Sequence, residues 1–334
     1  MNIGVDARAF GMANAMVAHT KDVNSGYWNP TGLLEIEDSE GSLMHANYFA
    51  NIAQYDYIGF AKKIDDRSAW GASIIRFGVD DILNTTQLID ANGNIDYNRI
   101  SLFSTADYGV TFSYARDLPV RGLRYGVNAK VIRRIIGDFA SSWGFGFDFG
   151  MQFEKNDWQF GVMVRDITTT YNIWNINEEE FKKIQDAQTQ DPLQNQDLPE
   201  SSEITLPKAQ VGLAKKVDFH NEMSLLTAVN LNMEFQQTND IISSKMVSIS
   251  PAVGFEFGYN DLAFIRAGAG NFQNSQSLFD IEGNNKKVTF QPNIGLGFHY
   301  KGISVDYALT DLGNQSAALY SNIFSVKVDL SIFR

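Results

Sequence analysis

The chain has 334 residues, a formal net charge of −12 and no cysteine. The lack of cysteine excludes a disulfide framework and a thiolate metal site, and the negative charge argues against a nucleic-acid partner. No run approaches the ~18 consecutive apolar residues that a transmembrane helix needs. The 24 Phe, 13 Tyr and 27 Gly are instead typical of a membrane β-barrel, which has aromatic girdles and a crowded lumen wall.

Residues 1–38 differ in pattern from the rest of the chain. Residues 7–18 are rich in small side chains and can form a short helix, and the aromatic segment 27–33 follows. Small residues let one backbone pack closely against another, so we predict that residues 1–38 form a plug inside a barrel built by residues 39–334. A disordered tail suits the aromatic residues badly. The first residues lack the basic and apolar regions of a secretory signal, so we treat the sequence as a mature or trimmed form.

From about residue 41 the chain alternates between apolar and polar residues. The clearest segment is 288–300, where apolar positions from Val288 to Tyr300 oppose small and polar positions from Thr289 to His299. Lipid outside and water inside would select this alternation. The segments with this pattern are 41–51, 53–64, 68–78, 102–116, 122–136, 139–155, 157–170, 206–217, 222–236, 246–259, 261–271, 286–301, 302–311 and 321–334. We therefore predict an all-β fold, a 14-stranded antiparallel transmembrane β-barrel with an N-terminal helical hatch in its lumen.

The connections alternate in length along the predicted strands. Tight turns follow the even-numbered strands, whereas most odd-numbered connections are longer, notably 79–101, 171–205, 236–245, 272–285 and 312–320. Outer-membrane barrels have short periplasmic turns and long extracellular loops. We therefore expect an outer-membrane protein with both termini in the periplasm.

Several charged residues have the parity of the lumen face. We expect them to pair across the barrel or with the plug, where Arg8 is a possible partner, rather than to line a substrate pathway, because both charge signs are mixed. The lumen charges are Arg124, Lys130, Arg134, Arg165, Asp148 and Glu256.

Two long connections, 79–101 and 171–205, carry apolar side chains that are unusual in water-facing loops. In the first, these residues either contact a partner or fold back over the lumen. In the second, they form either a partner anchor or an aromatic cap at the membrane interface. The candidate partner-binding residues are Ile82, Leu83, Leu88 and Ile89 in the first loop and Tyr171, Ile173, Trp174 and Ile176 in the second.

No catalytic or metal-binding constellation stands out. The four histidines are scattered, and we find no phosphate loop or nucleophile motif, so we expect no enzyme activity, no metal and no cofactor. Residues 90–96 resemble the start of a calcium loop, but Ile95 and Ser101 occupy positions that glycine and glutamate normally fill. The Asn92-Gly93 pair also simply favours a tight turn.

The N-terminal segment resembles the opening of the PorV/PorQ family of outer-membrane proteins, which is similar to the FadL-type barrels. The resemblance rests on 7–18 and 27–33, with Ala13 and Thr31 as small-for-small departures, and the opening is closer to PorV than to PorQ. The plug residues that carry this signature are Arg8, Gly11, Asn29, Pro30 and Gly32. The resemblance implies a 14-stranded barrel with an N-terminal hatch and a role in the type IX secretion system.

What this family resemblance implies for partners is protein binding without chemistry. Such proteins bind the SprA/Sov translocon barrel and secreted cargo through extracellular loops, and deliver cargo to a surface attachment complex that includes PorU. Two alternatives stay open. One is a FadL-like transporter of hydrophobic small molecules, for which Pro251 and Pro292 could mark strand kinks. The other is a PorQ-like structural surface barrel.

Overall fold

The computed structural model describes residues 3–48, 51–85, 87–88, 94–180, 201–220, 222–276, 286–310 and 321–333. Among these residues, no helix combines the length and apolar character that crossing a membrane requires.

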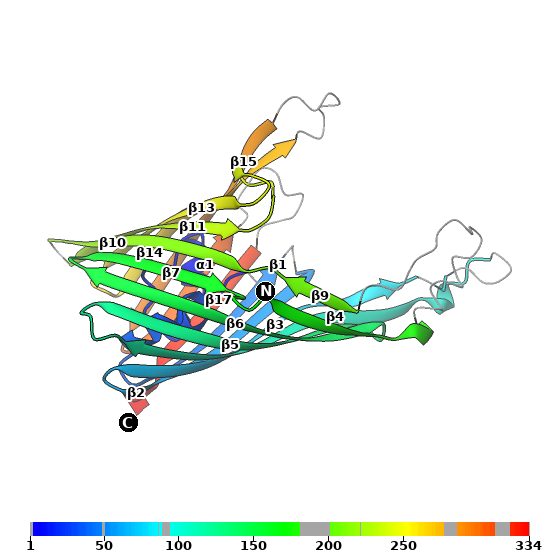
Figure 1. The fold of residues 1–334 in the computed structure, drawn as a ribbon, viewed down its shortest axis with the longest axis horizontal. Coiled ribbons are helices and arrows are strands. Elements are labelled where there is room, and N and C mark those ends of the chain that lie inside the picture. The colour runs from blue at the N-terminus through cyan, green and yellow to red at the C-terminus, as the bar shows by residue number, and fades with distance from the viewer. Residues whose placement is uncertain are drawn as a thin grey trace.

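Fourteen antiparallel strands close into one barrel (Figure 1). In chain order, the elements of the wall are β1 (Ser39–Tyr48), β2 (Ala53–Asp65), β3 (Ser68–Asn84), β4 (Ser101–Asp117), β5 (Leu123–Ile136), β6 (Ala140–Lys155), β7 (Trp158–Arg165), β8 (Thr170–Ile176), β9 (Ser202–Thr205), β10 (Lys208–Phe219), β11 (Met223–Glu234), β13 (Ser248–Tyr259), β14 (Ala263–Gln276), β15 (Lys286–Tyr300), β16 (Ile303–Thr310) and β17 (Ser321–Asp329). Both β7 and β8 pair with β6, so they are two halves of the seventh strand. Likewise β9 pairs with β8 and β10 with β7, so they are halves of the eighth. The barrel closes where β17 pairs with β1.

The predicted strand count and the alternation of short and long connections are confirmed. The bounds of several strands differ from the prediction: β3 continues to Asn84, β8 to Ile176 and β14 to Gln276, whereas β17 ends at Asp329. In addition, the seventh strand is interrupted at 166–169 and the eighth at 206–207.

Pro251 and Pro292 lie within ladders, where they pair with Leu231 and Ala269, although the register between β14 and β15 shifts between Gly270 and Gln273, close to Pro292. The interruptions of the wall are therefore not at Pro251 or Pro292, whereas Pro207 lies at the interruption of the eighth strand, where it cannot donate to the ladder.

Smaller elements lie in the connections. The two-residue β12 (Ile242–Ser243) pairs with the start of β13. The 3-10 helix η2 (Tyr97–Arg99) precedes β4, and η3 (Leu330–Phe333) follows β17.

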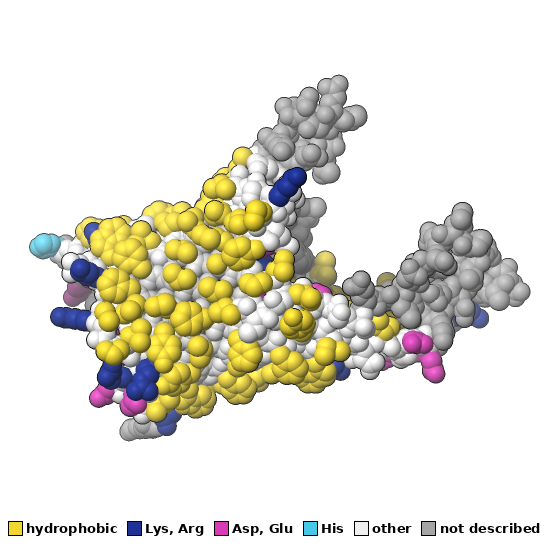
Figure 2. Space-filling view, in the orientation of Figure 1, with side chains coloured by type: hydrophobic (Ala, Val, Ile, Leu, Met, Phe, Trp, Pro, Cys, Tyr) yellow, Lys and Arg dark blue, Asp and Glu magenta, His cyan; other side chains and the backbone are white. Residues whose placement is uncertain are grey.

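The outer face of the barrel is apolar. On β6, Trp143, Phe145 and Phe147 are 50, 56 and 54% exposed, whereas the alternating Ser142 and Gly144 are buried. Figure 2 shows hydrophobic side chains covering this face of the wall, with charged residues gathered at one end. So many exposed apolar side chains are unfavourable in water, and they match a lipid-facing belt.

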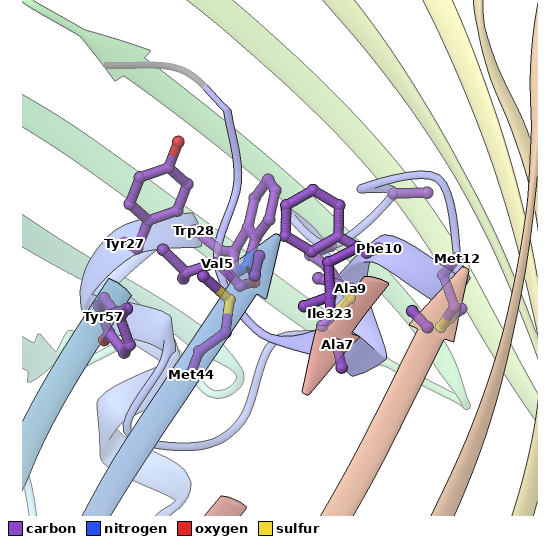
Figure 3. Packing of buried hydrophobic residues seen from close by; sticks show 14 of the residues in the cluster. Val5, Ala7, Ala9, Phe10, Met12, Tyr27, Trp28, Met44, Tyr57 and Ile323 are labelled. Atoms are coloured by element: carbon purple, nitrogen blue, oxygen red, sulfur yellow. Dashed lines mark hydrogen bonds between the residues drawn. The ribbon is translucent and has the colours of Figure 1, made fainter. Parts of the chain in front are cut away.

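The N-terminal segment fills the lumen as three short helical elements, α1 (Ala7–Gly11), α2 (Ser25–Trp28) and η1 (Pro30–Glu35). We call residues 3–38 the hatch. Its apolar residues, such as Phe10 and Trp28, pack with inward side chains of the wall, such as Met44 and Ile323 (Figure 3). The C-terminal end lies at the rim of short turns, as expected, whereas Ile3 lies inside the lumen and lines a cavity at the rim of long loops.

Glycines on the inner wall let the hatch approach the strands. A Cβ at Gly150 would lie 2.2 Å from the Asn29 Oδ1 atom, and one at Gly161 would lie 2.3 Å from the carbonyl oxygen of Val17. Because no side chain fits there, the small residues of the lumen face are a requirement of the plugged barrel.

Candidate functional site

One asparagine of the signature joins the hatch to the wall. The Asn29 Nδ2 atom donates to the carbonyl oxygens of Met151 at 3.0 Å and Val162 at 3.3 Å, which belong to β6 and β7, and to Val17 of the hatch at 3.1 Å. Its Oδ1 atom accepts from Thr31 Oγ1 at 2.8 Å and from the Thr31 backbone N–H at 3.4 Å, and the backbone contact caps η1. Asn29 therefore fixes both the start of a helix and the place where that helix meets the barrel.

The other signature residues are so closely packed that larger side chains would clash. A Cβ at Gly32 would lie 2.2 Å from the carbonyl oxygen of Thr20, within the hatch itself. Pro30 lies against Gly126 of β5, and Gly11 lies against the backbone of β15. Close packing of the hatch therefore accounts for Gly11, Pro30 and Gly32.

A buried ion cluster holds Arg8 of the hatch to the wall. Its Nε and Nη2 atoms donate to both carboxylate oxygens of Glu256 at 2.8 Å. Glu256 also accepts from Arg266 Nε at 2.6 Å, and Arg266 Nη1 donates to Asp306 at 2.6 Å. Two guanidinium groups thus face two carboxylates, so the cluster is electrically balanced across the hatch, β13, β14 and β16.

A second tie joins the hatch to the closing strand. Asp22 pairs with Lys327 of β17, and the Ser325 Oγ atom donates to Asp6 Oδ1 at 2.8 Å. Burial opposes ionisation of Asp22, but the charges of Lys327 and Arg8 outweigh it and hold the pKa of Asp22 below its ordinary value. Burial, with nearby Asp306, raises the pKa of Asp6. The pKa of the carboxyl that pairs with Lys327 therefore shifts downward, whereas the pKa of Asp6 shifts upward.

Lys130 and Asp148 lie at the interruption of the seventh strand. The Lys130 Nζ atom is 2.7 Å from a carboxylate oxygen of Asp148 and 2.7 Å from one of Asp166. The Asp166 amide donates to Asp148 at 2.9 Å, and φ is positive at Asp166 and Thr169. This triad satisfies polar groups that the interrupted ladder leaves without strand partners.

The remaining predicted lumen charges also find partners. Arg124 pairs with Glu35 of the hatch and, at 3.1 Å, with Glu154. The Arg165 Nη2 atom donates to the carbonyl oxygen of Tyr27 at 2.8 Å. Arg134 lies closer to the rim of long loops than the other lumen charges do, and it contacts Asp107 at 3.3 Å and Glu203 at 3.0 Å.

Two cavities flank the hatch. One, of about 740 Å³, opens toward the short turns and is lined by Arg8, His19 and Asp261 among others. The other, of about 540 Å³, opens toward the long loops. It is lined by Phe10 and Trp28 of the hatch and by the amides of Asn232, Gln291 and Asn293 of the wall. Burial lowers the pKa of His19 to about 3, so this imidazole is neutral in the folded hatch. Neither cavity resembles the apolar sleeve that a hydrocarbon ligand would need.

Six of the eight candidate partner residues lie in strands and not in loops, so that part of the prediction was wrong. Ile82 and Leu83 belong to β3, and Tyr171, Ile173, Trp174 and Ile176 belong to β8. Their strands continue past the neighbouring rim because β3 and β4 stay paired as far as Asn84 and Ser101. We call the raised sheet made by the outer ends of β3, β4, β5, β6, β8 and β9 the wing (Figure 1).

The wing residues divide between its two faces. Leu83 pairs with Leu102 on the outer face, and both are at least 60% exposed. Ile173 is 67% exposed on the same face. Trp174 points to the inner face, where its Nε1 atom donates to Glu203 Oε2 at 3.2 Å.

The connection between the third and fourth strands is only partly described. Leu88 lies in its described part, at a bend, whereas Ile89 and residues 90–93 of the calcium-like sequence lie outside the described residues.

Sequence reasoning missed several residues of the buried polar clusters. They are Asp22 and Lys327, which join the hatch to the wall, Asp166 and Asp306, which pair with Lys130 and Arg266 of the wall, and the buried His19. A parity count would have found Asp306 and Lys327, since each has the lumen parity of its strand, but Asp22 and His19 belong to an irregular segment that carries no such signal.

Comparison with known proteins decides the family. Residues 1–200 match the family described as Type IX secretion system protein PorV. The chain belongs to the PorV family. No curated protein matches it. The hatch that carries the signature and the first seven strands thus fall within the matched part of this PorV-family protein.

Solved structures with low sequence identity share the fold. A Pseudomonas aeruginosa FadL homologue has a TM-score of 0.55 at 12% identity, covering 98% of each chain. The Ralstonia pickettii toluene transporter TbuX has a TM-score of 0.58 at 12% identity, covering 97% of this chain and 98% of its own. The CymD monoaromatic hydrocarbon channel has a TM-score of 0.60 at 10% identity, covering 97% of each chain. The PorV-family protein is therefore an outer-membrane β-barrel with a FadL-like fold, and it is a component of the type IX secretion system by family.

Proposed function

We propose that this PorV-family barrel serves type IX secretion as a non-enzymatic binding protein. It engages the SprA/Sov translocon and secreted cargo at its extracellular side and passes cargo to a PorU-type attachment complex. The observation that carries the proposal is the hatch, which is fixed to the wall on several sides of the lumen. A barrel whose lumen is filled in this way acts through its surfaces.

The ties of the hatch support this reading. Glu256 and Lys327 bind the hatch from β13 and β17, while Asn29 binds it to the opposite strands β6 and β7. Removing the hatch would break each contact and leave several buried charges unpaired, at about 3–5 kcal/mol for each broken pair. Passage of a hydrophobic molecule through this lumen is disfavoured by the same charges.

The wing supports a binding role at the extracellular side. It carries the exposed apolar residues Leu83, Leu102 and Ile173 beyond the neighbouring rim of the barrel. Clusters of exposed apolar residues on a rigid sheet are suitable anchors for a protein partner.

Affinity isolation of the native protein from outer membranes tests the proposal. We expect recovery of the translocon and cargo to fall at least tenfold in Leu83→Glu and to stay unchanged in Val120→Glu. Val120 is a matched control because it is 57% exposed but lies in a short turn at the opposite rim. Heat-modifiable mobility on gels reports whether each barrel is folded. Recovery of neither translocon nor cargo with the unaltered protein would refute the proposal, and equal recovery with both variants would refute the role of the wing.

A further inference from the structure

The outer wall of β6, β7 and β10 carries two lysines beside one tryptophan at the rim of short turns. Trp158, the first residue of β7, pairs with Lys155 of β6 on one side and with Lys215 of β10 on the other. The Lys215 Nζ atom is 4.9 Å from the centre of the Trp158 ring, which is within the range of a cation–π contact. The register thus places one cation on each side of an exposed aromatic ring. We call Lys155, Trp158 and Lys215 the basic row.

The next outward row toward the membrane is apolar. It consists of Phe153, Phe160 and Leu213, which are paired across the same three strands. The ring centres of Phe153 and Phe160 are 6.4 Å apart, and the side chains of Phe160 and Leu213 are exposed on the outer face. The wall therefore changes from charged to apolar within two residues of each strand.

An open hollow in the outer wall joins the two rows. It measures about 430 Å³, and it has a polar end near the turn and an apolar end toward the membrane. Its lining residues are Lys155, Asn156 and Trp158 near the turn and Phe153, Phe160 and Leu213 beyond them. We call it the outer hollow. A site with this division fits an amphipathic molecule better than a wholly apolar one.

The depth of the outer hollow follows from β6. Six successive outward positions from Phe153 to Trp143 are apolar or aromatic. At ~3.4 Å per residue along a strand tilted by ~40°, they span the ~25 Å belt of an outer-membrane barrel. Lys155 is the next outward position of the same strand, so the basic row lies at the edge of the belt. Lipid headgroups lie at this level, where tryptophan is also enriched.

The charge of the site favours an anion. Among the described residues, neither Lys155 nor Lys215 forms an ion pair, whereas the neighbouring Lys216 pairs with Asp218 at 3.3 Å. The exposed Asp157 of the adjoining turn reduces the net charge of the site to +1. Figure 2 shows further Lys and Arg side chains at this rim of the barrel. Two cations at headgroup level without a carboxylate partner are complementary to a lipid phosphate.

We propose that the outer hollow binds one anionic phospholipid from the leaflet at the rim of short turns. Lys155 and Lys215 are two strands apart, about 10 Å at ~4.8 Å per strand, and their long side chains reach the phosphate from both sides. An acyl chain of the lipid runs over Phe153 and Phe160. A zwitterionic headgroup would bring its own ammonium close to the two lysines, which disfavours it. The inference concerns the lipid side of the barrel wall and does not rest on the proposed role in secretion.

Native mass spectrometry of the purified barrel tests the inference. Phosphatidylglycerol and phosphatidylethanolamine are titrated separately into the barrel in nonionic detergent, and the fraction of barrel that retains one lipid gives the dissociation constant. We expect phosphatidylglycerol to saturate one site and to bind roughly tenfold more tightly than phosphatidylethanolamine. Each lysine beside an anionic headgroup contributes about fivefold in affinity, so Lys155→Gln combined with Lys215→Gln should weaken phosphatidylglycerol binding about 25-fold.

A matched control removes two other cations from the same rim. Lys62→Gln combined with Lys301→Gln makes the same change of charge, and both lysines also lie beside aromatic residues. Lys62 pairs with Trp70, and the Lys301 Nζ atom is 5.2 Å from the centre of the Tyr300 ring. The two belong to β2 and to the turn between β15 and β16, so they do not flank one ring. We expect this variant to bind phosphatidylglycerol as the unaltered barrel does.

Three outcomes overturn the inference. Equal affinity for the two lipids would remove the selectivity for an anionic headgroup, and an equal loss in both double variants would remove the site. Stepwise retention of many lipids without a preferred first one would mean that lipid merely surrounds the barrel. Heat-modifiable mobility on gels shows that each variant is folded. Because the purified barrel is used without translocon or cargo, failure of the lipid site leaves the secretion role standing.

Discussion

The ion cluster around Arg8 makes a quantitative prediction about hatch stability. Arg8→Met leaves Glu256 with Arg266 as its remaining partner, so we expect the free energy of hatch opening to fall by about 3 kcal/mol. Glu256→Gln leaves two guanidinium groups facing one neutralised side chain, so we expect a loss nearer 5 kcal/mol. The double variant retains the Arg266–Asp306 pair, whose atoms are 2.6 Å apart, and removes one charge of each sign. Its loss should therefore be at least about 2 kcal/mol smaller than the sum of the single losses.

Hydrogen exchange measures this opening directly. A loss of about 3 kcal/mol accelerates exchange of amides in the hatch by roughly 100-fold, while amides in β6 should keep their rates. Lys216→Met is the control, because the Lys216–Asp218 pair is largely exposed at the short-turn rim and should contribute less than about 1 kcal/mol. Single losses that add within about 0.5 kcal/mol would refute the reasoning. Unchanged exchange of the hatch in Arg8→Met would show that the cluster does not hold it.

Three further predictions concern the hatch and the interrupted strand. Gly32→Ala places a Cβ at 2.2 Å from the carbonyl oxygen of Thr20 and should reduce the amount of heat-modifiable barrel in the membrane, whereas Gly41→Ala, whose nearest neighbour is 4.0 Å away, should not. His19 has its pKa lowered to about 3 in the folded hatch, so the opened state takes up the proton first as pH falls below about 6.5. The opening free energy, from exchange rates corrected for intrinsic pH dependence, should therefore drop by about 2 kcal/mol between pH 7.5 and 5. This drop should be absent in His19→Gln, and an equal drop in both proteins would contradict the assignment. Lys130→Met leaves two buried carboxylates without their ammonium, so the free energy of unfolding by urea in detergent should fall by about 3 kcal/mol. Replacement of the exposed Lys155 is the control, and an unaltered unfolding midpoint in Lys130→Met would show that the interruption does not depend on the triad.

Alternation along the chain was sufficient to predict the barrel. In a closed barrel, neighbours along a strand face lipid and lumen in turn, so every segment such as 288–300 records its own two environments. The lumen parity of Lys130 and Glu256 follows from the same rule. The signature of the hatch could be recognised, but its physical reason could not. The 2.2 Å limit at Gly32 and the bonds of Asn29 to β6 and β7 exist only in the folded protein.

Strand boundaries were less predictable where apolar residues continue past the membrane. The alternating pattern ends before Ile82, Leu83 and Ile173, so the sequence places them in the long connections 79–101 and 171–205. In the structure, pairing between neighbouring strands extends the sheet into the wing, and tertiary pairing decides a strand's end more than its own residues do.

The sequence by itself determined which side of each strand faces lipid and which faces the lumen, because that information is local and repeats every two residues. Only the tertiary structure decided which charges meet. Arg8 and Glu256 are 248 positions apart, and Asn47 and Asn322 become neighbours only when the last strand closes on the first. Pairing energies fall off over a few ångströms, so ion clusters and polar patches arise from the register that barrel closure imposes, and no single segment of the chain specifies them.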